Sequence, residues 1–202
     1  AEAARRTVAE IETLGGEAIA VEADLLEADA ARSIIARAVE RFGRVDALVN
    51  SASIYEPAGV VDTTEGLWDR HFAINLKAPF FLCRAFAAQL GERHGHIVNI
   101  ADWRGTHPTA SGVAYTLTKA GLITMTQSLA QALAPNVQVN AIAPGVILPP
   151  PGEGEEYVWR LLPSIPLRRS GSPADVVEAL LYLLRSGYVT GEVLYVTGGQ
   201  HL

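Results

Sequence analysis

Three side chains in the middle of the chain have the types and spacing of a proton-transfer site. Tyr115 and Lys119 are four residues apart in a segment with helical patterning, which predicts that both lie on one helix face. Asp102 precedes Tyr115 by thirteen positions (115 − 102 = 13), directly after the apolar run 96–100. A lysine beside a phenol lowers a pKa that is otherwise about 10. The spacing therefore predicts an acid/base phenol, a cation that tunes it, and a polar group at a strand end.

A proline singles out a fourth residue of this site. The stretch Glu65–Leu90 has helical apolar spacing and contains Pro79. Because proline has no N–H for the carbonyl four residues earlier, the backbone carbonyl of Asn75 is expected to be free and the helix to bend there. A helix kink with no chemical role is the alternative interpretation.

The elements that must position these residues alternate between helix and strand. Such alternation is typical of an α/β fold with a parallel sheet and helices on both faces. Helices are expected at 1–14, 28–42, 65–90, 112–134 and 173–184, and strands at 17–24, 45–50, 96–100, 136–143 and 193–196.

Composition narrows the class of protein. The 202 residues fit a single domain, 1–202, with 49% hydrophobic and 19% charged residues. The net charge of −6, without a basic cluster, disfavours nucleic acid as a partner. No apolar run approaches the ~18 residues of a membrane span. The single cysteine, Cys83, excludes an internal disulfide and favours a cytoplasmic protein. His94 and His96 have no further ligands at metal spacing, so no metal site is predicted.

A glycine-rich turn of the type G-x-x-x-G-x-G is absent from the sequence. In doubly wound folds such a turn holds a pyrophosphate at the first helix N-terminus. We therefore expect a strand, helix and strand of about 40 residues to precede Ala1, since a β-α-β unit takes roughly 30 or more. Without them, the strand expected at 17–24 has no neighbour to pair with.

Taken together, several motifs in a fixed order resemble the short-chain dehydrogenase/reductase family. They are Y-x-x-x-K at 115–119, Asn75, Asn50-Ser51-Ala52-Ser53 in place of the usual N-N-A-G, Pro144-Gly145, and T-G-x-x-x-x-V-x-G-G at 190–199. The resemblance implies a Rossmann-like doubly wound fold and a homo-oligomer, a dimer or tetramer, built on the helices at 65–90 and 112–134. It also implies NADPH as cofactor, with NADH not excluded. The cofactor-binding residues it implies are Asp24, Leu25, Asn50, Ser51, Ala52, Ser53, Tyr115, Lys119, Pro144, Gly145 and Val146.

Asp102 departs from the family pattern, which usually has a serine at this position. An ionised aspartate accepts hydrogen bonds only, so it suits a substrate with N–H groups better than a ketone. With N-x-A-S, it resembles the pteridine reductases and dihydromonapterin reductase-like enzymes, which use NADPH to reduce a pterin C=N bond. That resemblance implies protonation through Tyr115 and Asp102. Trp103, Tyr157 and Trp159 are candidate walls for a flat heterocycle, and 147–165 is the expected substrate lid.

Two other functions stay open. The first is a short-chain enzyme that acts on an ordinary ketone or alcohol, of the 3-oxoacyl type. The second is a non-catalytic relative that serves in binding or assembly.

Overall fold

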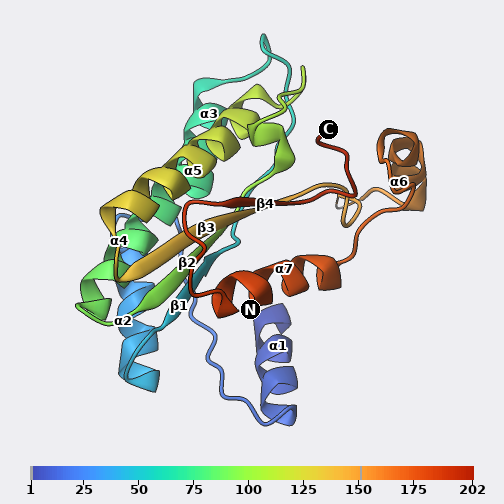
Figure 1. Cartoon of the computed structure of the whole chain (residues 1–202). Helices are drawn as coiled ribbons and strands as arrows, with labels where there is room; N and C mark the ends of the chain where they lie inside the picture. Colours follow the sequence, from blue (N-terminus) through green and yellow to red (C-terminus); the bar gives the residue numbers. More distant parts are fainter. Residues whose placement is uncertain (1, 151) are drawn as a thin grey trace.

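The computed structural model describes residues 2–150 and 152–202, and a parallel four-stranded sheet lies at their centre (Figure 1). The strands are β1 (Ala47–Asn50), β2 (Gly95–Ile100), β3 (Val137–Pro144) and β4 (Val193–Val196), in the order β1-β2-β3-β4. All three pairings are parallel, and the register places Asn50 opposite Asn99. The predicted α/β fold class, a doubly wound parallel sheet, is confirmed.

Helices cover both faces of the sheet (Figure 1). One face packs against α2 (Ala30–Phe42), α4 (Ala78–Leu90) and α5 (Val113–Ala132) through Ile97 and Val139. On the other face, α7 (Pro173–Arg185) packs against Val98 and Ile142. Successive strand residues point to opposite faces, so these apolar strands contribute to both cores.

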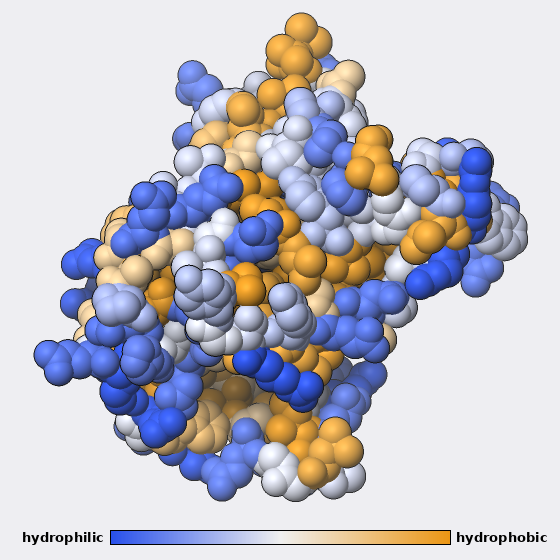
Figure 2. Space-filling model, in the orientation of Figure 1, coloured by the Kyte–Doolittle hydropathy of each residue, from blue (hydrophilic) through white to orange (hydrophobic). Residues whose placement is uncertain are grey.

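The remaining helices lie at the edges of this core. They are α1 (Glu2–Thr13), which has no buried residue, α3 (Glu65–Phe72) and α6 (Glu155–Leu161). Figure 2 shows apolar atoms at the tip of the loop before α3, where Val60 and Val61 are 72% and 95% exposed.

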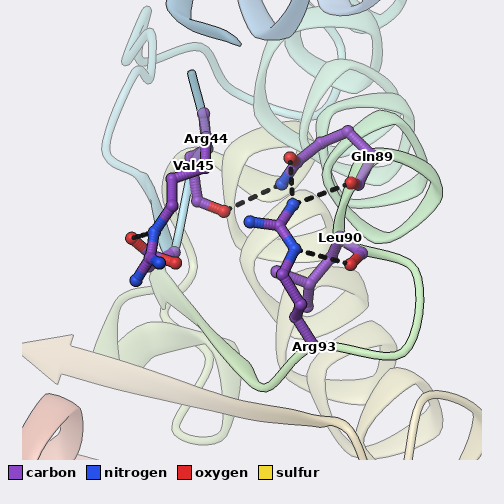
Figure 3. A network of polar contacts seen from close by, with 6 residues as sticks. Arg44, Val45, Gln89, Leu90 and Arg93 are labelled. Carbon is purple, nitrogen blue, oxygen red and sulfur yellow. Dashed lines mark hydrogen bonds and ion pairs between the residues drawn. The ribbon is translucent and has the colours of Figure 1, made fainter. Parts of the chain in front are cut away.

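The turn from α4 into β2 is held by side-chain contacts to backbone carbonyls. The Gln89 amide donates to the carbonyl of Val45 at 2.8 Å, and Arg93 donates to the carbonyls of Leu90 and Gln89 (Figure 3). The Arg93 contacts satisfy carbonyls that the end of α4 leaves free, and the Gln89 contact ties α4 to the segment before β1. A Cβ at Gly95 would lie 2.9 Å from Phe86, so glycine lets β2 start tight against α4.

Two expected elements differ from the structure. Residues 17–24 form no strand, because no neighbouring strand pairs with them among the described residues. The helix expected at 65–90 is divided into α3, a π-helix at Ala73–Lys77, and α4, whose first turn contains Pro79. The helix is thus interrupted just before Pro79 by a π-helix that contains Asn75, a form common at functional sites.

A chain of buried polar side chains connects β1, β2 and α5. The Asn50 amide donates to Oδ1 of Asn99 at 2.8 Å, and the Asn99 amide donates to Oγ1 of Thr126 at 2.8 Å. Asn99 and Thr126 are fully buried, so their hydrogen-bonding groups depend on one another. This chain fixes the strand ends relative to α5.

The substitution Asn99→Ala is expected to lower the free energy of unfolding by about 1–3 kcal/mol, because it leaves buried donors and acceptors on Asn50 and Thr126 without partners. Urea unfolding followed by circular dichroism measures the change. Gln127→Ala, at an exposed position of α5, is the control and should stay within about 0.5 kcal/mol. Equal effects of the two substitutions would contradict a structural role for the chain.

Candidate active site

Asp102 lies just beyond β2, where the backbone is still held by the sheet. The Ala101 N–H donates to the carbonyl of Ile142 at 2.7 Å, so the strand pairing extends to the residue before Asp102. Oδ1 of Asp102 accepts from the Arg104 N–H at 2.8 Å and caps a 3-10 turn at Trp103–Gly105. Ligands of open parallel sheets bind at this carboxyl edge of the strands. Sheet and turn thus fix both the position and the rotamer of the carboxylate.

Tyr115 and Lys119 face Asp102 from the first turns of α5. The Tyr115 hydroxyl donates to Oδ2 of Asp102 at 2.9 Å. Nζ of Lys119 donates to the carbonyl of Ile100 at 2.9 Å and lies 5.6 Å from the centroid of the Tyr115 ring. The structure therefore brings together the three residues that spacing singled out. Both α5 side chains are buried.

The pKa of Tyr115 differs from the prediction. Burial, the negative charge of Asp102 and the hydrogen bond to it raise the pKa of Tyr115 well above its ordinary value. Spacing alone predicted a lowered pKa, which is wrong for this structure, because burial and the carboxylate of Asp102 outweigh the opposite effect of Arg104. The resting phenol is therefore neutral and holds its proton. Burial lowers the pKa of Lys119 to about 8, although Asp102 acts in the opposite direction.

Asn75 is buried in the π-helix and fastens a loop to α5. Its Oδ1 accepts from the Ile54 N–H at 2.8 Å, and its amide donates to the Ile54 carbonyl at 2.9 Å and to Oγ1 of Thr118 at 3.3 Å. The side chain thus holds the segment after β1 beside the helix of Tyr115. The resemblance to the short-chain family implies that the backbone carbonyl of Asn75 takes part in a proton relay, and this role stays a prediction.

The residues expected to bind a cofactor line two strand ends. Ser51, Ala52 and Ser53 follow β1 and are exposed, whereas Asn50 is buried with its Oδ1 unpartnered. Pro144 ends β3. These positions leave polar backbone and serine hydroxyl groups available at the same edge as Tyr115 and Lys119, which fits a dinucleotide that crosses this edge.

Further cofactor candidates lie in the loops. A Cβ at Gly145 would meet Cα of Thr197 at 3.0 Å, so a larger residue would require the neighbouring backbone to shift by a few tenths of an ångström. The carbonyl of Val146 accepts from the Gly171 N–H at 2.9 Å. Asp24 is exposed and accepts from the Leu26 N–H at 2.9 Å, while Leu25 packs against the core. Their cofactor roles stay predictions.

The predicted aromatic walls have different positions. Trp103 is half-buried beside Asp102, with its ring 6.2 Å from that of His107. Tyr157 and Trp159 belong to α6, at the edge of the molecule to which the strands run (Figure 1). Tyr157 is half-buried, but Trp159 is 60% exposed. The expected lid at 147–165 thus contains α6, and its closure stays a prediction.

Two site residues were missed from the sequence. The ring of Tyr55 packs edge-on against that of Tyr115, with centroids 4.9 Å apart. The Arg104 guanidinium lies over the Tyr55 ring, 5.6 Å from its centroid. Arg104 follows Asp102 by two residues, and Tyr55 follows the motif at 50–53 by two, so proximity to those motifs is a signal that could have identified them.

Within the described residues, no group of three or more metal-ligating side chains is found, and no helix is long and apolar enough to cross a bilayer.

Comparisons with known proteins agree with this geometry. A family model described as enoyl-(acyl carrier protein) reductase matches residues 1–201. The structure of FolM alternative dihydrofolate reductase 1 from Brucella suis, in complex with NADP, superposes with a TM-score of 0.93 at 36% identity, over 98% of this chain and 80% of that one. A blue fluorescent protein from a metagenomic library, in complex with NADPH, has a TM-score of 0.89 at 30% identity, over 98% of this chain and 81% of the other.

Curated relatives include 3-oxoacyl-[acyl-carrier-protein] reductase FabG of Thermotoga maritima. It is 35% identical over 95% of this chain and 80% of its own length. The granaticin polyketide synthase putative ketoacyl reductase 2 of Streptomyces violaceoruber is 34% identical over 92% and 78%. The match over nearly the whole chain, together with the arrangement of Asp102, Tyr115 and Lys119, shows that the chain belongs to the short-chain dehydrogenase/reductase family of oxidoreductases.

Proposed function

We propose that this chain is an NADPH-dependent reductase of the C=N bond of a pterin-type heterocycle. The observation that carries the proposal is the hydrogen bond of 2.9 Å between the Tyr115 hydroxyl and Oδ2 of Asp102. A carboxylate stands beside the proton donor, and a carboxylate is a partner for ring N–H groups rather than for a carbonyl oxygen. The similarity to FolM alternative dihydrofolate reductase 1 supports the same substrate class.

The cofactor supplies a hydride when it is bound, and the chain supplies the proton. Tyr115 holds its proton at rest, since its pKa is raised. The hydroxyl is the group that protonates the ring nitrogen, while Asp102 accepts from a neighbouring N–H of the ring and orients it. Lys119 then stabilises the phenolate that remains. Lys119 and the segment 50–53 are the residues that would hold the nicotinamide side of NADPH; two similar structures contain NADP or NADPH.

Reduction of a ketone, of the 3-oxoacyl type, is the second candidate. The relatives named as 3-oxoacyl and ketoacyl reductases favour it. The carboxylate of Asp102 disfavours it, because negative charge beside a carbonyl oxygen opposes the charge that develops there.

Replacement of Asp102 separates the two candidates. In Asp102→Ser, kcat/KM for dihydrobiopterin should fall by about 100-fold or more, because the charged acceptor for ring N–H groups is replaced by a neutral hydroxyl, while ketone reduction stays equal or rises. The measurement is NADPH consumption with dihydrobiopterin, dihydrofolate and a ketone, on protein expressed with any residues that precede Ala1 naturally.

Asp46→Ser, which removes a carboxylate just before β1, is the matched control and should leave all three rates unchanged. Turnover of the ketone alone by the unmodified protein would refute the pterin proposal.

The pKa of Lys119 predicts the alkaline limb of activity. Because this pKa is about 8, the ammonium loses its proton as the pH rises through that value, and with it the charge that stabilises the phenolate. We expect kcat/KM to fall above pH ~8. In Lys119→Arg the cation persists, since arginine titrates above about 12, so the residual kcat/KM should not fall there. An unchanged alkaline limb in the variant would contradict this assignment.

We also propose a homo-oligomer, a dimer or tetramer, that buries the face of α3, α4 and α5. A groove there is lined by Phe72, Leu76, Phe80, Gly121 and Met125. Phe80 is 43% exposed, and Leu76 lies so close to Gly121 that an added Cβ would meet it at 2.9 Å. The groove is therefore largely apolar, with Asp69 and Lys77 also in its lining, and such a groove suits a second copy of the chain.

Phe80→Glu should convert the oligomer to monomers, because it places a charge in the apolar groove. Size-exclusion chromatography with light scattering measures the mass. Thr7→Glu adds the same charge on the exposed helix α1 and should leave the mass unchanged. A monomeric unmodified protein, or an oligomer that persists in Phe80→Glu, would contradict the proposed interface.

A further inference from the structure

Arg104 is a charged side chain of the site whose charge has no partner within it. No ion pair forms between its guanidinium and a carboxylate of the described residues. Its Nε is buried without a hydrogen-bond partner. The recorded contact of the guanidinium is with the face of the Tyr55 ring, at 5.6 Å from the centroid. Half-buried charges and buried donors are normally paired, so this arrangement calls for an acceptor.

The neighbours keep this guanidinium charged. Burial acts to lower the pKa of Arg104, but Asp102 and three tyrosines, Tyr55, Tyr115 and Tyr157, outweigh it, and the pKa lies above its ordinary value. Asp102 does not neutralise the side chain by direct contact. Its Oδ1 accepts from the backbone N–H of Arg104 at 2.8 Å, and its Oδ2 accepts from Tyr115. Both of these hydrogen bonds come from groups other than the guanidinium.

The backbone of Arg104 is fixed relative to the reacting groups. The 3-10 turn that Asp102 caps contains Arg104, and a Cβ at the next residue, Gly105, would lie 2.9 Å from the backbone of Lys119. The turn is therefore packed tightly against α5. The guanidinium lies over Tyr55, whose ring contacts Tyr115, so the cation stands one ring away from the proton donor.

We propose that Arg104 is a specificity-determining residue that binds a carboxylate carried by the substrate. Guanidinium and carboxylate form paired hydrogen bonds, which supply the acceptor that Nε lacks. In this arrangement Asp102 binds the N–H side of the substrate and Arg104 its acidic side. This inference rests on the proposed reduction of pterins. It adds that the preferred substrate carries an acidic group.

The test compares substrates that differ in the acidic group. Dihydrofolate has carboxylates on its side chain, and dihydrobiopterin has none. In Arg104→Gln, KM for dihydrofolate should rise by about tenfold, whereas kcat and KM for dihydrobiopterin change by less than about threefold. In Arg104→Lys, which keeps the charge without the planar fork, the rise for dihydrofolate should be intermediate. Arg37→Gln on the distant helix α2 is the charge-matched control and should change neither KM.

Salt gives an independent readout. For the unmodified protein, KM for dihydrofolate should increase with ionic strength, and this dependence should weaken in Arg104→Gln. If Arg104 has only a structural role, Arg104→Gln should raise KM for both substrates equally and leave the salt dependence of KM for dihydrofolate unchanged. Either of these two results would overturn the inference.

The inference and the proposed function can fail separately. If the unmodified protein reduces no pterin but does reduce ketones, the proposed function is refuted. The test of Arg104 is then repeated with acetoacetate as the acidic substrate and its ethyl ester as the neutral one. Arg104→Gln should then raise KM for acetoacetate alone. Tryptophan fluorescence, with Trp103 beside the site, measures binding of folate and biopterin without turnover. A similar loss of affinity for both ligands in Arg104→Gln would overturn the inference.

Discussion

The hydrogen bond between Tyr115 and Asp102 is the constraint on which the account of this protein depends. It joins the carboxyl end of β2 to the first turn of α5, at 2.9 Å, inside a buried site. A phenol that donates to a carboxylate keeps its proton, and a carboxylate in this place receives N–H groups. The site is therefore arranged as a proton donor beside an acceptor. That arrangement favours a nitrogen heterocycle over a simple carbonyl compound.

The fold supports this contact from several directions. Strand pairing holds the backbone up to Ala101, and the buried chain from Asn50 through Asn99 to Thr126 ties the strand ends to α5. Asn75 fastens the segment after β1 to the same helix. The contacts among Asn50, Asn99 and Thr126 are buried, so these side chains depend on one another for their hydrogen bonds. The positions of the Tyr115 hydroxyl and the Asp102 carboxylate therefore depend on contacts along the whole carboxyl edge of the sheet.

Patterns in the sequence predicted the parallel sheet, the shared face of Tyr115 and Lys119, and the interruption of the helix near Pro79, because each depends on local spacing or on backbone chemistry. Residues 17–24 form no strand because no strand pairs with them in the described chain. The periodicity of a segment does not show whether such a partner is present. The predicted direction of the pKa shift of Tyr115 was wrong, because the shift depends on the burial of the phenol and on the carboxylate of Asp102 beside it. Tyr55 and Arg104 were missed for a similar reason: their contacts cross from one loop to another.

Calorimetric titration of an oxidised pterin into the NADP-bound protein, unmodified and as Asp102→Asn, tests the central claim most directly. The substitution keeps the shape of the side chain but replaces one acceptor oxygen with a donor, which would face a ring N–H. The account predicts that the dissociation constant rises by about tenfold or more, as expected when a charged hydrogen bond is lost. Equal affinity of the two proteins would contradict it.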